Sequence, residues 1–239
     1  AGERGYKYLY ATQSLKLNDG LFSYKAHFHT DQDYNFDKEY PSDYLGKTSH
    51  DFQPQKTKSF NVRYQKDGFD MGMNYKYFSE SALIAMNGKN SLLNAFDKDA
   101  NLNSELFSTF LRYKATLFNN IEATTTLKYQ STELLKDSYF RNIYTSYEPG
   151  YKYSKSQRYA IEETLNKTYE NHNLTFGSSV EWLNSIPMTY DLPKKSLSNV
   201  YINGSNKEIE APIYDINWNN IAFYLQDQIT LNDNFQLSL

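Results

Sequence analysis

The chain has 239 residues, a formal charge of −3, no cysteine, 23 tyrosines and 15 phenylalanines. The near-neutral charge, without a basic stripe, excludes the usual nucleic-acid-binding surface, and the lack of cysteine excludes a disulfide framework and a thiolate metal site. No run of 18 apolar residues occurs, so a transmembrane helix is excluded, although membrane strands, which alternate apolar and polar residues, are not. Tyrosine and phenylalanine pack well on a pleated surface, and their abundance predicts an all-β chain.

Five short turn signals divide the chain into pairs of predicted strands. They contain Asn, Asp and Gly, which tolerate the positive φ angles that tight hairpins need. The signals are Asn18-Asp19-Gly20, Asp67-Gly68, Asn119-Asn120, Glu170-Asn171-His172-Asn173 and Asn232-Asp233-Asn234. The strands predicted around them are 5–17 with 21–30, 57–66 with 69–79, 105–117 with 121–131, 158–169 with 173–184, and 218–231 with 235–239.

These segments alternate in polarity. Within 121–131, for example, one face carries Ile121, Ala123, Thr125, Leu127 and Tyr129, and the other carries Glu122, Thr124, Thr126, Lys128 and Gln130. Successive side chains of a strand point to opposite sides, so the pattern predicts one apolar and one polar wall. Phe110 breaks the pattern, and Trp218 falls on the polar wall unless a bulge precedes it, whereas Trp182 falls on the apolar wall.

Long polar segments, 31–56, 80–104, 132–157 and 185–217, separate the strand pairs. They are too long for ordinary connections in a compact soluble domain. Short turns at one end and long loops at the other are typical of an outer-membrane barrel, with the turns in the periplasm and the loops outside. Strands of about 10 residues can cross a tilted bilayer. Segment 81–96 is predicted to be either a short helix folded into the lumen or a packed loop.

Two segments of the last third carry a family resemblance. His172-Asn-Leu-Thr-Phe-Gly-Ser-Ser-Val-Glu181 resembles the pattern H-x-L-x-x-G-x-E, although Ser178-Ser179 stands where that pattern has a shorter spacing to the acid. The segment Asn219–Leu239 resembles the pattern A-x-Y-x-Q-D, which Ala222, Tyr224, Gln226 and Asp227 match. Both patterns are those of TonB-dependent outer-membrane receptors. Residues 1–171 are similar to that family in architecture only.

The resemblance implies a transmembrane antiparallel up-and-down β-barrel, with short periplasmic turns and long extracellular loops. Residues 1–239 would form one partial barrel domain, about ten strands of a larger barrel, without the plug domain or the last strands. The implied function is import of a metal chelate, such as a siderophore, haem or a cobalamin-like ligand, across the bacterial outer membrane. Its implied partners are outer-membrane lipid, the chelate, and the TonB complex through the missing plug. No cofactor, catalysis or nucleic-acid partner is expected.

His27 and His29 are candidate ligand-binding residues, because two positions apart on a strand places them on one face, near the outer rim of the lumen. Two imidazoles could hold a metal or haem iron. The alternative is that they are ordinary lumen-lining residues, since the spacing supplies no third ligand. Further candidates lie in the first and third long segments, where aromatic and arginine side chains suit ligand capture: Tyr34, Tyr40, Tyr44, His50, Arg141, Tyr144 and Tyr147.

Other functions are weaker interpretations of the same residues. The acid pairs Asp31/Asp33 and Asp97/Asp99 supply too few oxygens for a calcium site, and the neighbours Ser49 and His50 do not by themselves make a nucleophile and its base. A passive porin-type barrel of ten strands would share all the strand and turn signals, but Leu239 ends partway through an alternating run, which favours an incomplete barrel. A soluble all-β binding module would fold without detergent.

Overall fold

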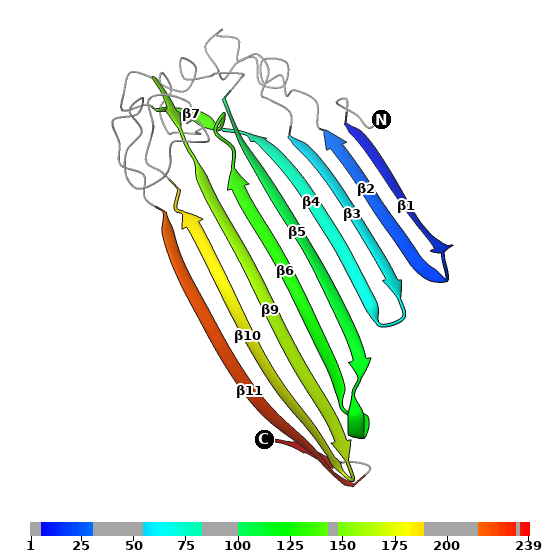
Figure 1. The fold of residues 1–239 in the computed structure, drawn as a ribbon. Helices are drawn as coiled ribbons and strands as arrows, with labels where there is room; N and C mark the ends of the chain where they lie inside the picture. The colour runs from blue at the N-terminus through cyan, green and yellow to red at the C-terminus, as the bar shows by residue number, and fades with distance from the viewer. Residues whose placement is uncertain (1–5, 31–54, 83–99, 143–147, 189–214, 233–234) are drawn as a thin grey trace.

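The computed structural model describes residues 6–30, 55–82, 100–142, 148–188, 215–232 and 235–239 (Figure 1). Ten strands form one antiparallel sheet in the order β1-β2-β3-β4-β5-β6-β9-β10-β11-β12, so the fold is an all-β meander, as predicted. The strands are β1 (Lys7–Leu17), β2 (Gly20–Thr30), β3 (Lys56–Lys66), β4 (Phe69–Ser81), β5 (Asn101–Thr116), β6 (Glu122–Leu134), β9 (Ser154–Tyr169), β10 (His172–Ile186), β11 (Ile216–Asn232) and β12 (Phe235–Ser238).

The turns have the backbone geometry that their residues favour. Asn18 and Asp19 have φ of 48° and 61°, and Asp67 and Gly68 have φ of 45° and 85°. Two consecutive positive φ angles match the twist of a two-residue hairpin. The five predicted strand pairs are confirmed, but several predicted turns were too long, because Gly20, His172 and Asn232 belong to strands.

The register gives the sheet two different faces. Leu111 pairs with Leu127, Leu127 with Ile161, and Ile161 with Val180, and the row continues to Met71 on one side and Ile221 on the other. Directly paired residues share a face, so this row defines what we call the apolar face. The next row, on what we call the polar face, contains Asp70, Arg112, Thr126, Glu162 and Ser179.

The apolar face is bare in the part of the chain that the structure describes. Ile161 is 44% exposed and Phe223 is 70% exposed. The buried hydrophobic residues in the described ranges are Ala100, Tyr153, Ala160 and Ile186, too few to form a core over this surface. An exposed apolar area of this extent marks a surface that contacts protein or membrane.

The two residues that broke the alternation lie on the polar face without a bulge. Phe110 pairs with Gly72, where a Cβ atom would stand 2.6 Å from the phenylalanine ring, so the ring covers a position without a side chain. Trp218 pairs with Leu183 in a register that runs unbroken from Ser185 to His172. Both departures are therefore genuine features of the polar face.

The predicted long connection 132–157 is present between β6 and β9, but it contains a second, two-stranded sheet where no strand was predicted. This sheet consists of β7 (Tyr139–Asn142) and β8 (Glu148–Tyr151). The buried Ser138 anchors it, because its hydroxyl accepts a hydrogen bond from the Asn103 amide at 2.9 Å and donates to the Asn103 carbonyl at 3.1 Å. The Ser138 side chain thus provides the hydrogen bonds to β5 beyond the point where β6 ends. The polarity pattern along a strand cannot reveal such a side-chain contact.

The sheet is open, and its strands are staggered. β1 pairs with β2 alone, and residues 216–226 of β11 pair with β10 alone, so the described chain leaves two strand edges unpaired. The first residue of β4 pairs with Tyr113, and β5 continues three residues beyond that point. In the same way, the first residue of β6 pairs with Asn166, and β9 continues three residues beyond it. Figure 1 shows the hairpin turns descending in steps along one end of the sheet. Stagger of this kind accompanies strand tilt in closed barrels.

No helix in the described ranges is long and apolar enough to cross a membrane. Segment 83–99, which covers most of the predicted lumen helix or packed loop, lies outside the described residues.

Candidate functional site

The polar face of the first hairpin carries a cluster that we call the Tyr–His wall. β1 and the residue before it supply three tyrosines at alternate positions, and β2 supplies a lysine and two histidines. Tyr8 pairs with His29 and Tyr10 with His27, which places all the rings on one face at the end away from the turn. The wall consists of Tyr6, Tyr8, Tyr10, Lys25, His27 and His29.

The rings of the wall are in mutual contact. The Tyr8 and His27 ring centroids lie 5.0 Å apart, and those of Tyr6 and His29 lie 4.7 Å apart. The His27 and His29 rings lie 6.4 Å apart with planes at 15°, and Tyr8 and Tyr10 have the same separation and angle. Such distances are those of interacting aromatic pairs.

The structure places His27 and His29 on one face, as predicted. It also places Tyr6 and Tyr8 beside them, which the two-residue spacing of the histidines did not reveal. The predicted lack of a third ligand followed from counting along one strand only, whereas the neighbouring strand supplies phenol oxygens. The signal was present in the sequence as the alternation of Tyr6, Tyr8 and Tyr10, but using it requires the register of the hairpin.

Tyr10 differs from the other two tyrosines because a cation covers it. The Lys25 ammonium lies 5.4 Å from the Tyr10 ring centroid, a distance typical of a cation–π contact. Tyr8 is 55% exposed. In the described ranges no three His, Cys, Asp or Glu side chains come together as a metal site, so a donor set here needs phenol oxygens.

Ion pairs cross the middle of the polar face. The Arg63 guanidinium donates two hydrogen bonds of 2.7 Å to Asp70, and Arg112 lies 3.8 Å from the same carboxylate. Further along the sheet, Lys128 pairs with Glu162 at 2.6 Å, and Arg158 pairs with Glu181. Asp70 and the small residues Thr126 and Ala160 are buried. The polar face is therefore a cross-linked wall of matched charges.

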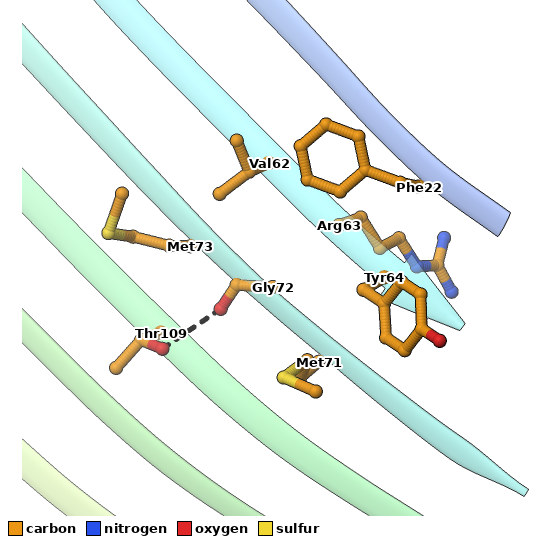
Figure 2. Close-up of a pocket in the computed structure, with 8 residues that line it drawn as sticks. All are labelled: Phe22, Val62, Arg63, Tyr64, Met71, Gly72, Met73 and Thr109. Carbon is orange, nitrogen blue, oxygen red and sulfur yellow. Dashed lines mark hydrogen bonds between the residues drawn. The ribbon is translucent and has the colours of Figure 1, made fainter. Parts of the chain in front are cut away.

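An open hollow of about 240 Å³ lies on the apolar face (Figure 2). Its lining is Phe22, Val62, Arg63, Tyr64, Met71, Gly72, Met73 and Thr109. The Thr109 hydroxyl donates to the Gly72 carbonyl at 2.9 Å, so that polar group is already satisfied. The hollow offers mainly apolar surface and lies on the face opposite the Tyr–His wall.

The motif residues of the last third meet across β10 and β11. His172 Nδ1 lies 2.7 Å from Asp227 Oδ2, and Gly177 lies beneath the Tyr224 ring. Asp227 Oδ1 is buried and has no hydrogen-bond partner in the described residues. Glu181 lies further from Gly177 than the acidic residue of the pattern H-x-L-x-x-G-x-E does. Its carboxylate pairs with Arg158.

Most of the other predicted site residues lie outside the described residues. These are Tyr34, Tyr40, Tyr44, His50, Tyr144 and Tyr147, together with the acids Asp31, Asp33, Asp97 and Asp99. The Arg141 backbone lies in β7, opposite Pro149, and its side chain is outside the described part. The assignment of the tyrosines, His50 and Arg141 as ligand-binding residues stays a prediction, whereas the four acids were not assigned to a site.

Comparisons with family models, with curated proteins and with solved structures find no match to this chain.

Proposed function

We propose that this sheet is part of the wall of a transmembrane β-barrel, in a bacterial outer-membrane receptor that imports a metal chelate with energy supplied through TonB. One observation carries the proposal: long strands with an exposed apolar face on one side and an ion-paired polar face on the other. A soluble sheet would bury the first face in a core. A membrane barrel turns it toward lipid and lines its interior with the second.

The height of the apolar band fits a bilayer. On the apolar face of β5, the apolar band begins at Phe107 and ends at Leu117, the residue that follows the strand. Ten residues rise about 33 Å along a strand, which becomes about 25 Å across the membrane at a tilt of about 40°. That is the height of the apolar band of outer-membrane barrels.

Aromatic rings mark one border of the band. Phe107 and Tyr129 have ring centroids 5.9 Å apart, and Tyr129 and Tyr159 have centroids 4.8 Å apart, with Trp182 paired to Tyr159 on the next strand. The Gln157 amide donates to the Tyr129 hydroxyl at 2.8 Å. Rings with an apolar body and a polar edge concentrate where lipid tails meet headgroups.

Two carboxylates of the described residues lie among apolar side chains on the apolar face. Asp227, between Leu225 and Ile229, contacts His172. Glu163 lies within the band between Ile161 and Leu165. The Thr125 hydroxyl donates to it at 2.5 Å, and Ser178 pairs with it on the other side. Acidic residues on a lipid-facing surface cost less than basic ones. A hydrogen-bonded Glu163 is therefore compatible with the proposed lipid face.

The receptor interpretation is supported by the pairing of the motif residues. His172 with Asp227, and Gly177 with Tyr224, tie β10 to β11 at two points. The residues of the two family patterns thus act as one structural unit. The sheet geometry alone would equally suit a passive porin-type channel.

Uptake by cells separates the two functions. Cells with and without the gene, each with and without TonB, would be given radiolabelled ferric chelates, haem and cobalamin. We expect accumulation of at least one ligand to require both the gene and TonB. Accumulation that depends on the gene and persists without TonB would favour the passive channel, and accumulation independent of the gene would contradict both.

A further inference from the structure

We propose that Tyr6, Tyr8, His27 and His29 bind a transition-metal ion that accepts both imidazole and phenolate ligands, namely an ion of the Cu(II) or Fe(III) class. The binding itself is independent of transport. Only the interpretation of the site as a contact for the imported metal rests on the proposed function.

The two histidines provide the nitrogen donors. They stand two residues apart on β2, with rings nearly parallel and centroids 6.4 Å apart. A metal lies about 2.0–2.1 Å from each imidazole nitrogen, so the two nitrogens must come within roughly 3–4 Å of each other. Binding therefore requires rotation about the side-chain torsions of the two histidines, which already share one face of β2.

The two tyrosines provide oxygen donors on the other side. The Tyr8 ring centroid lies 5.0 Å from that of His27, and the Tyr6 ring centroid lies 4.7 Å from that of His29. Tyrosine is a known ligand of ferric iron in haem proteins, and imidazole suits copper, iron, nickel and zinc. Among divalent ions at such a site, Cu(II) binds most tightly, which makes it the sharpest probe.

Lys25 limits which tyrosines can belong to the donor set and which charge the bound metal species can have. Its ammonium lies 5.4 Å from the Tyr10 ring centroid, so a positive charge stands beside this tyrosine, and the donor set is taken from Tyr6 and Tyr8, whose rings contact the histidines. Lys25 also stands two residues from His27 on the same face of β2. A nearby positive charge lowers the affinity for a bare cation and favours a metal that arrives with anionic ligands of its own, so a bare-ion test needs Cu(II), the divalent ion that binds such donors most tightly. A partly coordinated anionic chelate with open positions fits this arrangement.

The test is a Cu(II) titration of the native protein, purified in detergent from outer membranes. Binding is followed by electron paramagnetic resonance and by the visible phenolate-to-copper charge-transfer band. We expect the double variant His27→Ala/His29→Ala to bind at least about 10- to 100-fold more weakly, because loss of even the hydrogen-bond partners of a metal ligand costs that much and this variant removes both nitrogen ligands. His172→Gln, on the apolar face near the opposite end of the sheet, is the matched control and should leave binding unchanged.

The tyrosine variants keep the proposal falsifiable if the double histidine variant fails to fold. Tyr8→Phe and Tyr6→Phe each remove one oxygen atom, and together they should abolish the charge-transfer band. Equal Cu(II) affinity in the native protein and a folded His27→Ala/His29→Ala variant would overturn the proposal, and so would an unchanged band in the double tyrosine variant. Because these titrations involve no transport, their failure is distinguishable from failure of the uptake experiment.

Discussion

Replacement of Gly68 by valine is expected to destabilise the protein by about 2–5 kcal/mol, the sum of a left-handed backbone and an overpacked contact. Gly68 has φ of 85°, and a Cβ atom there would overlap the carbonyl oxygen of Lys114 on β5. The same approach lets the Lys114 amide donate to the Gly68 carbonyl at 2.9 Å. The measurement is denaturant unfolding of the native protein and the variant, which gives the difference in their free energies of unfolding.

Asp67→Asn is the matched control for Gly68→Val. Asp67 has φ of 45°, and asparagine tolerates this conformation as well as aspartate does. Its effect should stay within about 0.5 kcal/mol. Equal stability of Gly68→Val and Asp67→Asn would contradict the position of the β3–β4 turn and its contact with β5.

Replacement of Gly177 by alanine is expected to cost about 1–3 kcal/mol, because a Cβ atom there would displace the Tyr224 ring. The double variant Gly177→Ala/Tyr224→Ala removes the clash together with the ring. Its loss of stability should therefore be smaller than the sum of the two single losses. Denaturant unfolding of the four proteins in detergent measures this coupling.

Ser179→Ala is the control for Gly177→Ala, since Ser179 is the next residue on the polar face of β10 and pairs with Ala222. It should show no coupling to Tyr224→Ala. Strict additivity of Gly177→Ala and Tyr224→Ala would contradict the β10–β11 register, and with it the structural unit formed by the motif residues.

The strands and most turns could be predicted because their signals are local. An alternation of period two and a pair of residues that tolerate positive φ are visible within a dozen positions. The β7–β8 hairpin could not be predicted in this way, since its strands have four residues each and its anchor is a hydrogen bond from Asn103 on the distant strand β5 to Ser138, the residue before β7.

The Tyr–His wall shows why a site built from two strands is not visible in the spacing of residues along one of them. A first turn that includes Gly20, as the turn signal suggests, would pair Leu17 with Leu21 and place Tyr8 opposite Thr30. The structure pairs Leu17 with Gly20 and Tyr8 with His29. A shift of one residue moves every side chain of a strand to the other face. The tyrosines can therefore be placed beside the histidines only with the correct register, which the spacing of the histidines along one strand does not give.

Phe110 and Tyr224 illustrate the same dependence on register. Each is an aromatic residue on the polar face, opposite a glycine of a neighbouring strand, Gly72 or Gly177. Either residue alone looks like an exception to the alternation, and only the pairing explains both. The predicted loop residues, among them Tyr34 and Tyr144, stay predictions.

The central claim is that the apolar face contacts lipid and the polar face contacts the barrel interior. The chain has no cysteine, so single cysteines at Ser179 and Val180, neighbours on opposite faces of β10, can each carry a nitroxide spin label in the native protein within outer membranes. Collisions with dissolved oxygen report lipid, and collisions with a water-soluble nickel chelate report water. We predict that the label at Val180 collides more with oxygen than with the nickel chelate, and that the label at Ser179 does not. Equal accessibility at the two positions, or the reverse order, would contradict a membrane-facing apolar face.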